Sequence, residues 1–93
     1  MAYARRTDAN QSQVVEALRA RGWYVCITSA VGNGFFDAIA VKHGRVRFVE
    51  IKDGAKVKSK RKLTPAEAAM HEDFLRAGAE VVILETIDQA VSL

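Results

Sequence analysis

Three charged residues interrupt the most apolar part of the chain, and this conflict constrains the fold more than any other feature. The stretch from residue 34 to residue 52 reads as two β-strands joined by a tight turn at His43-Gly44. The charged residues within it are Asp37, Glu50 and Lys52. Because burying an unpaired charge is costly, each of these side chains needs a partner that an apolar hairpin does not supply.

Hairpin geometry brings the two acids together. Asp37 and Glu50 lie six residues before and six residues after the central pair of the turn, so we expect them at the same end of the hairpin. Two carboxylates held close repel unless a cation lies between them, and oxygen ligands favour Mg²⁺ or Mn²⁺. The acids therefore predict a metal site.

Lys52 follows Glu50 by two residues and projects from the same face of its strand. A lysine beside a metal can orient an attacking water or neutralise charge on a phosphate. Together these residues indicate a hydrolytic site for phosphodiesters. Spacing alone also fits a simpler interpretation, in which Glu50 and Lys52 form an ion pair at a strand end.

Two further segments supply candidate site residues. Gln11 lies in the first predicted helix, where its amide can reach the metal site or act as the capping-box partner of Asp8. In the loop before the hairpin, Gly32 and Gly34 permit unusual backbone angles and close contact with a bulky ligand. Ser29 in that loop can hydrogen-bond a phosphate. A plain flexible turn is the alternative for this loop.

The charge distribution favours a polyanionic partner. The chain has 93 residues and a net charge of +3, and a basic run follows the hairpin. Its members are Lys56, Lys58, Lys60, Arg61 and Lys62. We predict that this run follows DNA phosphates, with a solvated loop as the alternative.

The 93 residues predict one domain, 1–93. There is no run of 18 apolar residues, and the N-terminus lacks the apolar core of a secretory signal. The single cysteine, Cys26, cannot form an internal disulfide, and we expect it to be a small core residue. These features predict a cytoplasmic protein with no membrane span.

Periodicity and capping signals predict the order α-β-β-β-α-β-α. The first helix begins at an Asp8 cap, and the second begins at a Thr64 cap, with Glu67 completing a capping box. The strands are predicted at 23–28, 35–41, 46–52 and 80–84, with a short helix at 87–91. We expect an antiparallel meander followed by a fourth strand that runs parallel to a neighbour through a right-handed crossover. This is an α/β fold with a mixed four-stranded sheet flanked by helices.

The residues resemble a known nuclease group. Gly34-Phe-Phe-Asp37 followed by Glu50-Ile-Lys52 is similar to the Asp…Glu-x-Lys signature of the PD-(D/E)XK superfamily. A wider pattern resembles the virus-type replication-repair nuclease (VRR-NUC) family over nearly the whole chain. That pattern comprises Arg6–Gln11, Ser29–Asp37, Lys62–Pro65, Glu67 and His71-Glu72.

The resemblance implies a restriction-endonuclease-like αβββαβ core and a small DNA endonuclease that uses Mg²⁺ or Mn²⁺. It also implies a homodimer, often encoded by phages and related in fold to Holliday-junction resolvases, that acts on branched or junction DNA. Asp37, Glu50 and the carbonyl of Ile51 would bind the metal, and Lys52 would be catalytic. Gln11 occupies a position where many relatives have Glu or Gln.

Two departures from the family pattern matter. Phe36 replaces the proline of the signature, a change at a residue that touches no metal, and the amide of Gln11 lowers the negative charge of the site. A non-catalytic nucleic-acid-binding module with the same fold is the alternative function.

Overall fold

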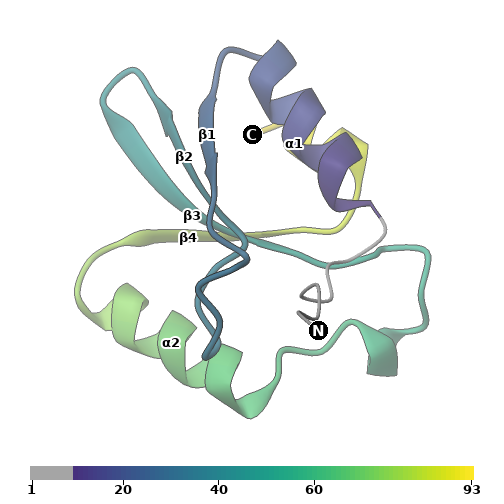
Figure 1. Cartoon of the computed structure of the whole chain (residues 1–93), viewed down its shortest axis with the longest axis vertical. Helices are drawn as coiled ribbons and strands as arrows, with labels where there is room; N and C mark the ends of the chain where they lie inside the picture. The colour runs from purple at the N-terminus through teal and green to yellow at the C-terminus, as the bar shows by residue number, and fades with distance from the viewer. Residues whose placement is uncertain (1–9) are drawn as a thin grey trace, which may run out of the picture.

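The computed structural model describes residues 10–93 and folds them into one mixed sheet with three α-helices (Figure 1). Asp8, the predicted helix cap, lies outside the described residues. The elements are α1 (Gln11–Ala20), β1 (Tyr24–Ile27), β2 (Ala38–Lys42), β3 (Arg45–Ile51), the 3-10 turn η1 (Lys58–Lys60), α2 (Pro65–Arg76), β4 (Glu80–Leu84) and α3 (Ile87–Val91). Within residues 10–93 no helix is long and apolar enough to span a membrane.

The sheet has the order β1-β2-β3-β4. The first three strands pair antiparallel, and β4 runs parallel to β3. The tight turn between β2 and β3 is formed by His43 and Gly44, which both have positive φ angles of 51° and 77°. Two central residues with positive φ are the requirement of a two-residue hairpin turn whose twist matches its strands. The predicted mixed sheet and its strand directions are therefore confirmed.

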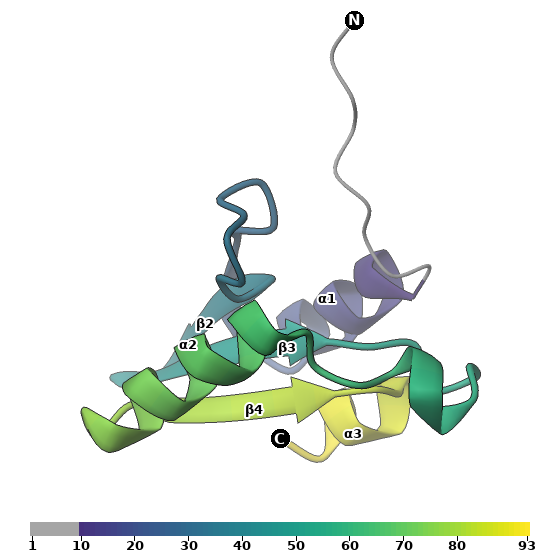
Figure 2. The same ribbon diagram turned by 90° about the horizontal axis from the view of Figure 1, so that it is seen from below.

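Alternating residues divide the sheet into two different faces. One face packs against α1 and α3, and it forms the main apolar core. This core includes Val14, Val15, Leu18, Trp23, Val25, Ala38, Ala40, Val49, Ile51, Leu84 and Ala90. The other face carries Phe48 and Glu50 and is covered by α2, so the helices lie on opposite sides of the sheet (Figure 2).

A cluster of aromatic rings fastens α2 to its face of the sheet. The ring centroids of Phe36 and Phe48 lie 5.4 Å apart, and those of Phe48 and Phe74 lie 4.8 Å apart. Phe36 is fully buried. Edge and tilted contacts of this kind stabilise aromatic pairs beyond their buried area.

Three local predictions were wrong. The second strand begins at Ala38 rather than at residue 35, because residues 32–34 all have positive φ and turn the chain before it enters the sheet. Cys26 is exposed rather than part of the core, because alternation along β1 places Val25 in the core and Cys26 on the opposite face. The first helix has Asn10 as its N-cap, without a side-chain capping bond.

Asn10 instead joins the start of α1 to the ends of two strands. Its Nδ2 donates hydrogen bonds of 3.1 Å to the carbonyl oxygens of Lys52 and Glu85. Lys52 follows β3 and Glu85 follows β4. The first turn of α1 is thereby held at the end of the sheet where the charged residues of the hairpin lie.

Candidate active site

Asp37 and Glu50 meet across the β2–β3 ladder. The register pairs Ala38 with Val49, so Asp37 and Glu50 form the next pair toward the open end of the hairpin. Glu50 is only 1% exposed, and its side chain hydrogen-bonds that of Asp37. Oδ2 of Asp37 also accepts a 2.7 Å bond from the backbone N–H of Ile51. The proximity expected from the turn is present in the structure.

The environment of Glu50 favours its neutral form. Burial, followed by the hydrogen bond with Asp37 and the charge of Asp37, raises the pKa of Glu50 to about 10. Two adjacent carboxylates in a site of low polarity cannot both be ionised without a cation. A proton on Glu50 thus occupies the role that a metal ion would otherwise take, namely balancing the charge of the acid pair.

Lys52 is held from the second helix. Its Nζ donates a 2.8 Å hydrogen bond to Oε1 of Glu67, and both side chains are largely buried. Burial acts to raise the pKa of Glu67, but the hydrogen bonds from Lys52 and from the backbone of Thr64 outweigh it, and the pKa is lowered. Glu67 is therefore a carboxylate that fixes the ammonium group of Lys52 beside Glu50.

Glu67 both caps α2 and contacts the candidate site. The same oxygen, Oε1, accepts a 2.9 Å bond from the backbone N–H of Thr64, which completes the predicted capping box. Sequence reasoning found the capping role of Glu67 but missed its contact with Lys52. No local pattern links the two residues, because the contact depends on how α2 docks on the sheet.

His71 lies one helical turn after Glu67 and supports Glu50. Its Nε2 lies 3.1 Å from Oε1 of Glu50, and its ring stacks on Phe36 with a centroid distance of 4.8 Å. Burial lowers the pKa of His71, so the imidazole is neutral at pH 7. The structure thus gives His71 a hydrogen-bonding and packing role, which orients Glu50.

Gln11 and Ser29 form a buried contact between α1 and the loop after β1. Gln11 is the first residue of α1, and its Nε2 donates a 3.4 Å bond to Oγ of the buried Ser29. Within the described part of the chain, Oε1 of Gln11 is buried and has no hydrogen-bond partner. A buried oxygen without a donor is costly, so this atom is suited to receive a metal ion or a water bound to one.

The donors present fit a hard divalent cation. Among residues 10–93, no group of three or more His, Cys, Asp or Glu side chains is arranged to hold a metal ion. The available set is instead two carboxylates, from Asp37 and Glu50, supplemented by the amide oxygen of Gln11 and the carbonyl of Ile51. An all-oxygen set of this kind suits Mg²⁺ or Mn²⁺, with waters and a substrate phosphate as the remaining ligands.

The loop glycines approach α2 closely. A Cβ built on Gly34 would lie 2.6 Å from the backbone carbonyl group of Ala66, and Gly34 has a φ of 82°. Any side chain at this position would clash with the first turn of α2. Gly32 also has a positive φ, of 78°. Their predicted contact with DNA stays a prediction, but the close approach made by Gly34 is to α2.

The predicted basic run forms the segment that leads from β3 to α2. Lys56, Lys58, Lys60 and Lys62 are exposed. Arg61 differs, because its Nη1 lies 3.1 Å from Oε2 of Glu85 and its side chain is only 24% exposed. The lysines are thus available to solvent, while Arg61 ties the segment to the end of β4.

A solved structure supports the fold predicted from the sequence. No protein-family model matches the sequence, and no significant match is found among curated proteins. A solved structure described as "VRR_NUC domain" has a TM-score of 0.69 and 26% sequence identity, and the match covers 90% of this chain and 92% of that chain. The chain has the VRR-NUC fold. The likeness supports the VRR-NUC family predicted from the sequence, and with it a nuclease fold.

Because Glu50 is protonated in the folded protein, we expect the free energy of unfolding to depend on pH. A folded-state pKa of about 10 against an ordinary value of 4.5 means that the stabilising contribution of neutral Glu50 is complete below about pH 4.5 and is lost as the pH rises toward 10. Glu50→Gln keeps a neutral side chain at every pH. We therefore expect it to stabilise the protein in EDTA at pH 8 by at least about 1.4 kcal/mol, the equivalent of one pKa unit.

Thermal unfolding at pH 4.5 and pH 8 measures this effect. A gain of about 1 kcal/mol corresponds to roughly 4–8 °C for a domain of this size. The gain should be small at pH 4.5, where glutamate is half protonated even when unfolded. An equal difference between the two proteins at both pH values would contradict the assignment of the proton to Glu50.

Proposed function

We propose that the protein is a metal-dependent endonuclease that hydrolyses phosphodiester bonds of DNA. The observation that carries the proposal is the pair of Asp37 and the buried Glu50, with Lys52 held beside it, at the end of a sheet with a nuclease fold. The acid pair carries its negative charge poorly without a cation. The same site offers an ammonium group for the charge that develops on a phosphate during hydrolysis.

The residues divide the chemistry between them. Asp37, Glu50, the Ile51 carbonyl and Gln11 would hold Mg²⁺ or Mn²⁺, with Glu50 releasing its proton as it becomes a ligand. When bound, the ion supplies Lewis-acid stabilisation and a more acidic water. Lys52 donates hydrogen bonds to a phosphate oxygen as negative charge builds on it.

The supporting residues keep these groups in place. Glu67 holds Nζ of Lys52 from α2, and His71 restricts the rotation of Glu50 through the contact at Oε1. Ser29 fixes the amide of Gln11, so that Oε1 points away from Ser29. Positioning of this kind raises the rate because the groups need no reorganisation during the reaction.

We further propose that the substrate is branched or junction DNA and that the enzyme acts as a homodimer in the cytoplasm. The lysines of the segment between β3 and α2 would contact phosphates, together with Ser29 and the glycine loop. A domain of 93 residues has little surface for reading bases, which favours recognition of DNA shape. A twofold dimer would present two sites to two strands.

Cleavage assays test the activity. We expect cutting of plasmid, flap or four-way-junction DNA in Mg²⁺ or Mn²⁺ and none in EDTA. Asp37→Asn, Glu50→Gln and Lys52→Ala should each lower the rate by about 100-fold or more, since each removes a group that acts in the transition state. DNA binding without cleavage under any metal condition would instead favour the non-catalytic module. The absence of both binding and cleavage would contradict the proposal.

The role of Glu67 is tested by separating its two contacts. Glu67→Ala removes the 2.8 Å contact between Glu67 and Lys52 and part of the helix cap. Thr64→Ala weakens the cap by about 1 kcal/mol and leaves that contact in place. We expect Glu67→Ala to lower kcat about tenfold with little change in KM, while Thr64→Ala retains the rate.

Glu67→Gln adds a second control. Its amide oxygen still accepts hydrogen bonds from Lys52 and Thr64, so a large part of kcat should return. If Thr64→Ala and Glu67→Ala lower kcat equally, Glu67 acts only through the stability of α2.

Sedimentation velocity tests the dimer. The chain has a mass of 10.2 kDa, and we expect a species of twice that mass at micromolar concentration. A protein that stays monomeric at active concentrations would remove the dimer from the proposal and leave the activity untouched.

A further inference from the structure

Part of the α2 face of the sheet is apolar and open. The strand register places six uncharged side chains on this face, in two rows that cross β1, β2 and β3. One row is Tyr24, Val41 and Val46, and the other is Cys26, Ile39 and Phe48. We call these six residues the open apolar face. Tyr24 is 76% exposed, Val46 is 42% exposed, and Cys26 is also exposed.

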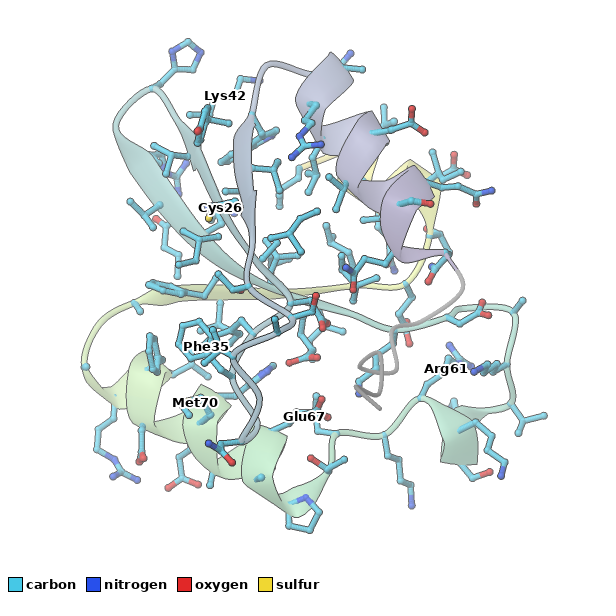
Figure 3. The ribbon with its side chains drawn as sticks, in the orientation of Figure 1. Cys26, Phe35, Lys42, Arg61, Glu67 and Met70 are labelled. Carbon is cyan, nitrogen blue, oxygen red and sulfur yellow. The ribbon has the colours of Figure 1, made fainter. Side chains whose placement is uncertain are left out.

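The helix α2 covers only one side of this face. Phe74 of α2 contacts Phe48 at the end of the second row. The tip of the β2–β3 hairpin extends away from α2 (Figure 1), and Cys26 lies well away from Met70 on that helix (Figure 3). The elements formed by residues 10–93 therefore leave most of the open apolar face in contact with solvent.

The chemistry of the open apolar face fits a protein and not DNA. The six side chains include no cation, whereas DNA binding depends on cations at the phosphates. Depletion of charge and the presence of aromatic side chains are typical of the buried centre of a protein interface. A surface without charge can also meet a copy of itself across a twofold axis, because no like charges are then opposed. A second copy of this chain is therefore a suitable partner.

The size of the face suits the centre of a dimer interface. Three strands about 4.8 Å apart, over four residues of about 3.4 Å each, cover about 14 Å by 14 Å, or about 200 Å². A standard interface buries about 800 Å² on each partner, about an eighth of the 6070 Å² accessible surface of this chain. Such an interface has an apolar centre and a polar rim, so the open apolar face supplies the centre.

Arg19 favours contact through the face over contact through the edge of the sheet. β1 is an edge strand, and the backbone groups of edge strands can pair with a strand of another chain. Nη2 of Arg19 donates a 3.0 Å hydrogen bond to the carbonyl of Val25 on β1. A charged side chain at this place opposes the pairing of a second β1 strand.

We propose that the open apolar face is the twofold interface of a homodimer, with Tyr24 as its most exposed anchor. This inference rests on the proposed function, because it assigns a surface to the dimer proposed there. The next row of the same face holds Asp37 and Glu50, about 7 Å along the strands. Each copy thus carries its acid pair at the margin of the interface, and one dimer holds two sites.

Glutamate substitutions test the surface by sedimentation velocity. We compare Tyr24→Glu and Val46→Glu with Val91→Glu as a matched control. Val91 is 41% exposed, against 42% for Val46, and lies on α3, which packs against the opposite face of the sheet. A substitution enters a twofold interface twice, so two like charges would meet in an apolar surface. We expect Tyr24→Glu and Val46→Glu each to raise the dimer Kd about 100-fold or more, and Val91→Glu to leave it unchanged.

Cys26 gives a second readout in the unmodified protein. It is the single cysteine of the chain and is exposed on the open apolar face. We expect its reaction with an aromatic disulfide reagent to slow as dimer forms, by about tenfold when about nine-tenths of the protein is dimeric. Protection at every concentration would mean that the cover comes from the same chain. Equal reactivity in monomer and dimer would mean that the dimer forms elsewhere, and either result would overturn the inference.

The outcomes separate the interface from the rest of the proposed function. A dimer that persists in both Tyr24→Glu and Val46→Glu refutes this surface and leaves the dimer itself in place. Thermal unfolding checks that the variants fold. If they do not, Tyr24→Ser removes the ring without adding charge and should raise the dimer Kd about tenfold. An unmodified protein that is monomeric at every concentration refutes both the interface and the dimer, and DNA cleavage is then judged by its own assay.

Discussion

The structure depends on how two adjacent carboxylates, one of them buried, are kept from repelling each other. Asp37 and Glu50 meet because the turn at His43-Gly44 fixes the register of β2 and β3. Burial and the neighbouring acid raise the pKa of Glu50 to about 10, so a proton provides the balance. A divalent cation would also balance the charge of the acid pair. It would in addition bind further oxygen ligands and take part in catalysis. The same arrangement therefore explains how the fold tolerates these acids and why a metal would bind them.

The first two turns of α2 are organised around that pair. Glu67 contacts Lys52, and His71 contacts Glu50, four residues apart and so on one face of the helix. Gly34 packs against Ala66 in the first of these turns. The start of α2 is thus held against β3 and against the loop that precedes β2. This explains why the most deeply buried residue of α2 is a histidine rather than an aliphatic side chain.

The predictable parts of the structure are those set by local rules. The two-residue turn fixed the positions of Asp37 and Glu50 by counting, and the Thr64 capping box located the start of α2. Cys26 was misplaced because its apolar neighbours hid the alternation of a strand with one open face. The second strand was placed too early because the apolar residues before Asp37 pack against α2 and not within the ladder. The contacts of Glu67 and His71 arise only when α2 docks, and no spacing in the sequence encodes that docking.

Local sequence patterns also do not predict where the charged side chains lie on the folded molecule. The cations form two surfaces, one at the tip of the hairpin and one after β3, which are separated by the length of the sheet. The exposed side of α2 carries Glu72 and Asp73, which pair with Arg76. The cations at the tip share the α1 face of the sheet, whereas Glu50 lies on the opposite face, under α2. The basic segment after β3 leads directly from Lys52 to the start of α2, so it is the basic surface whose position the sheet ties to the acid pair.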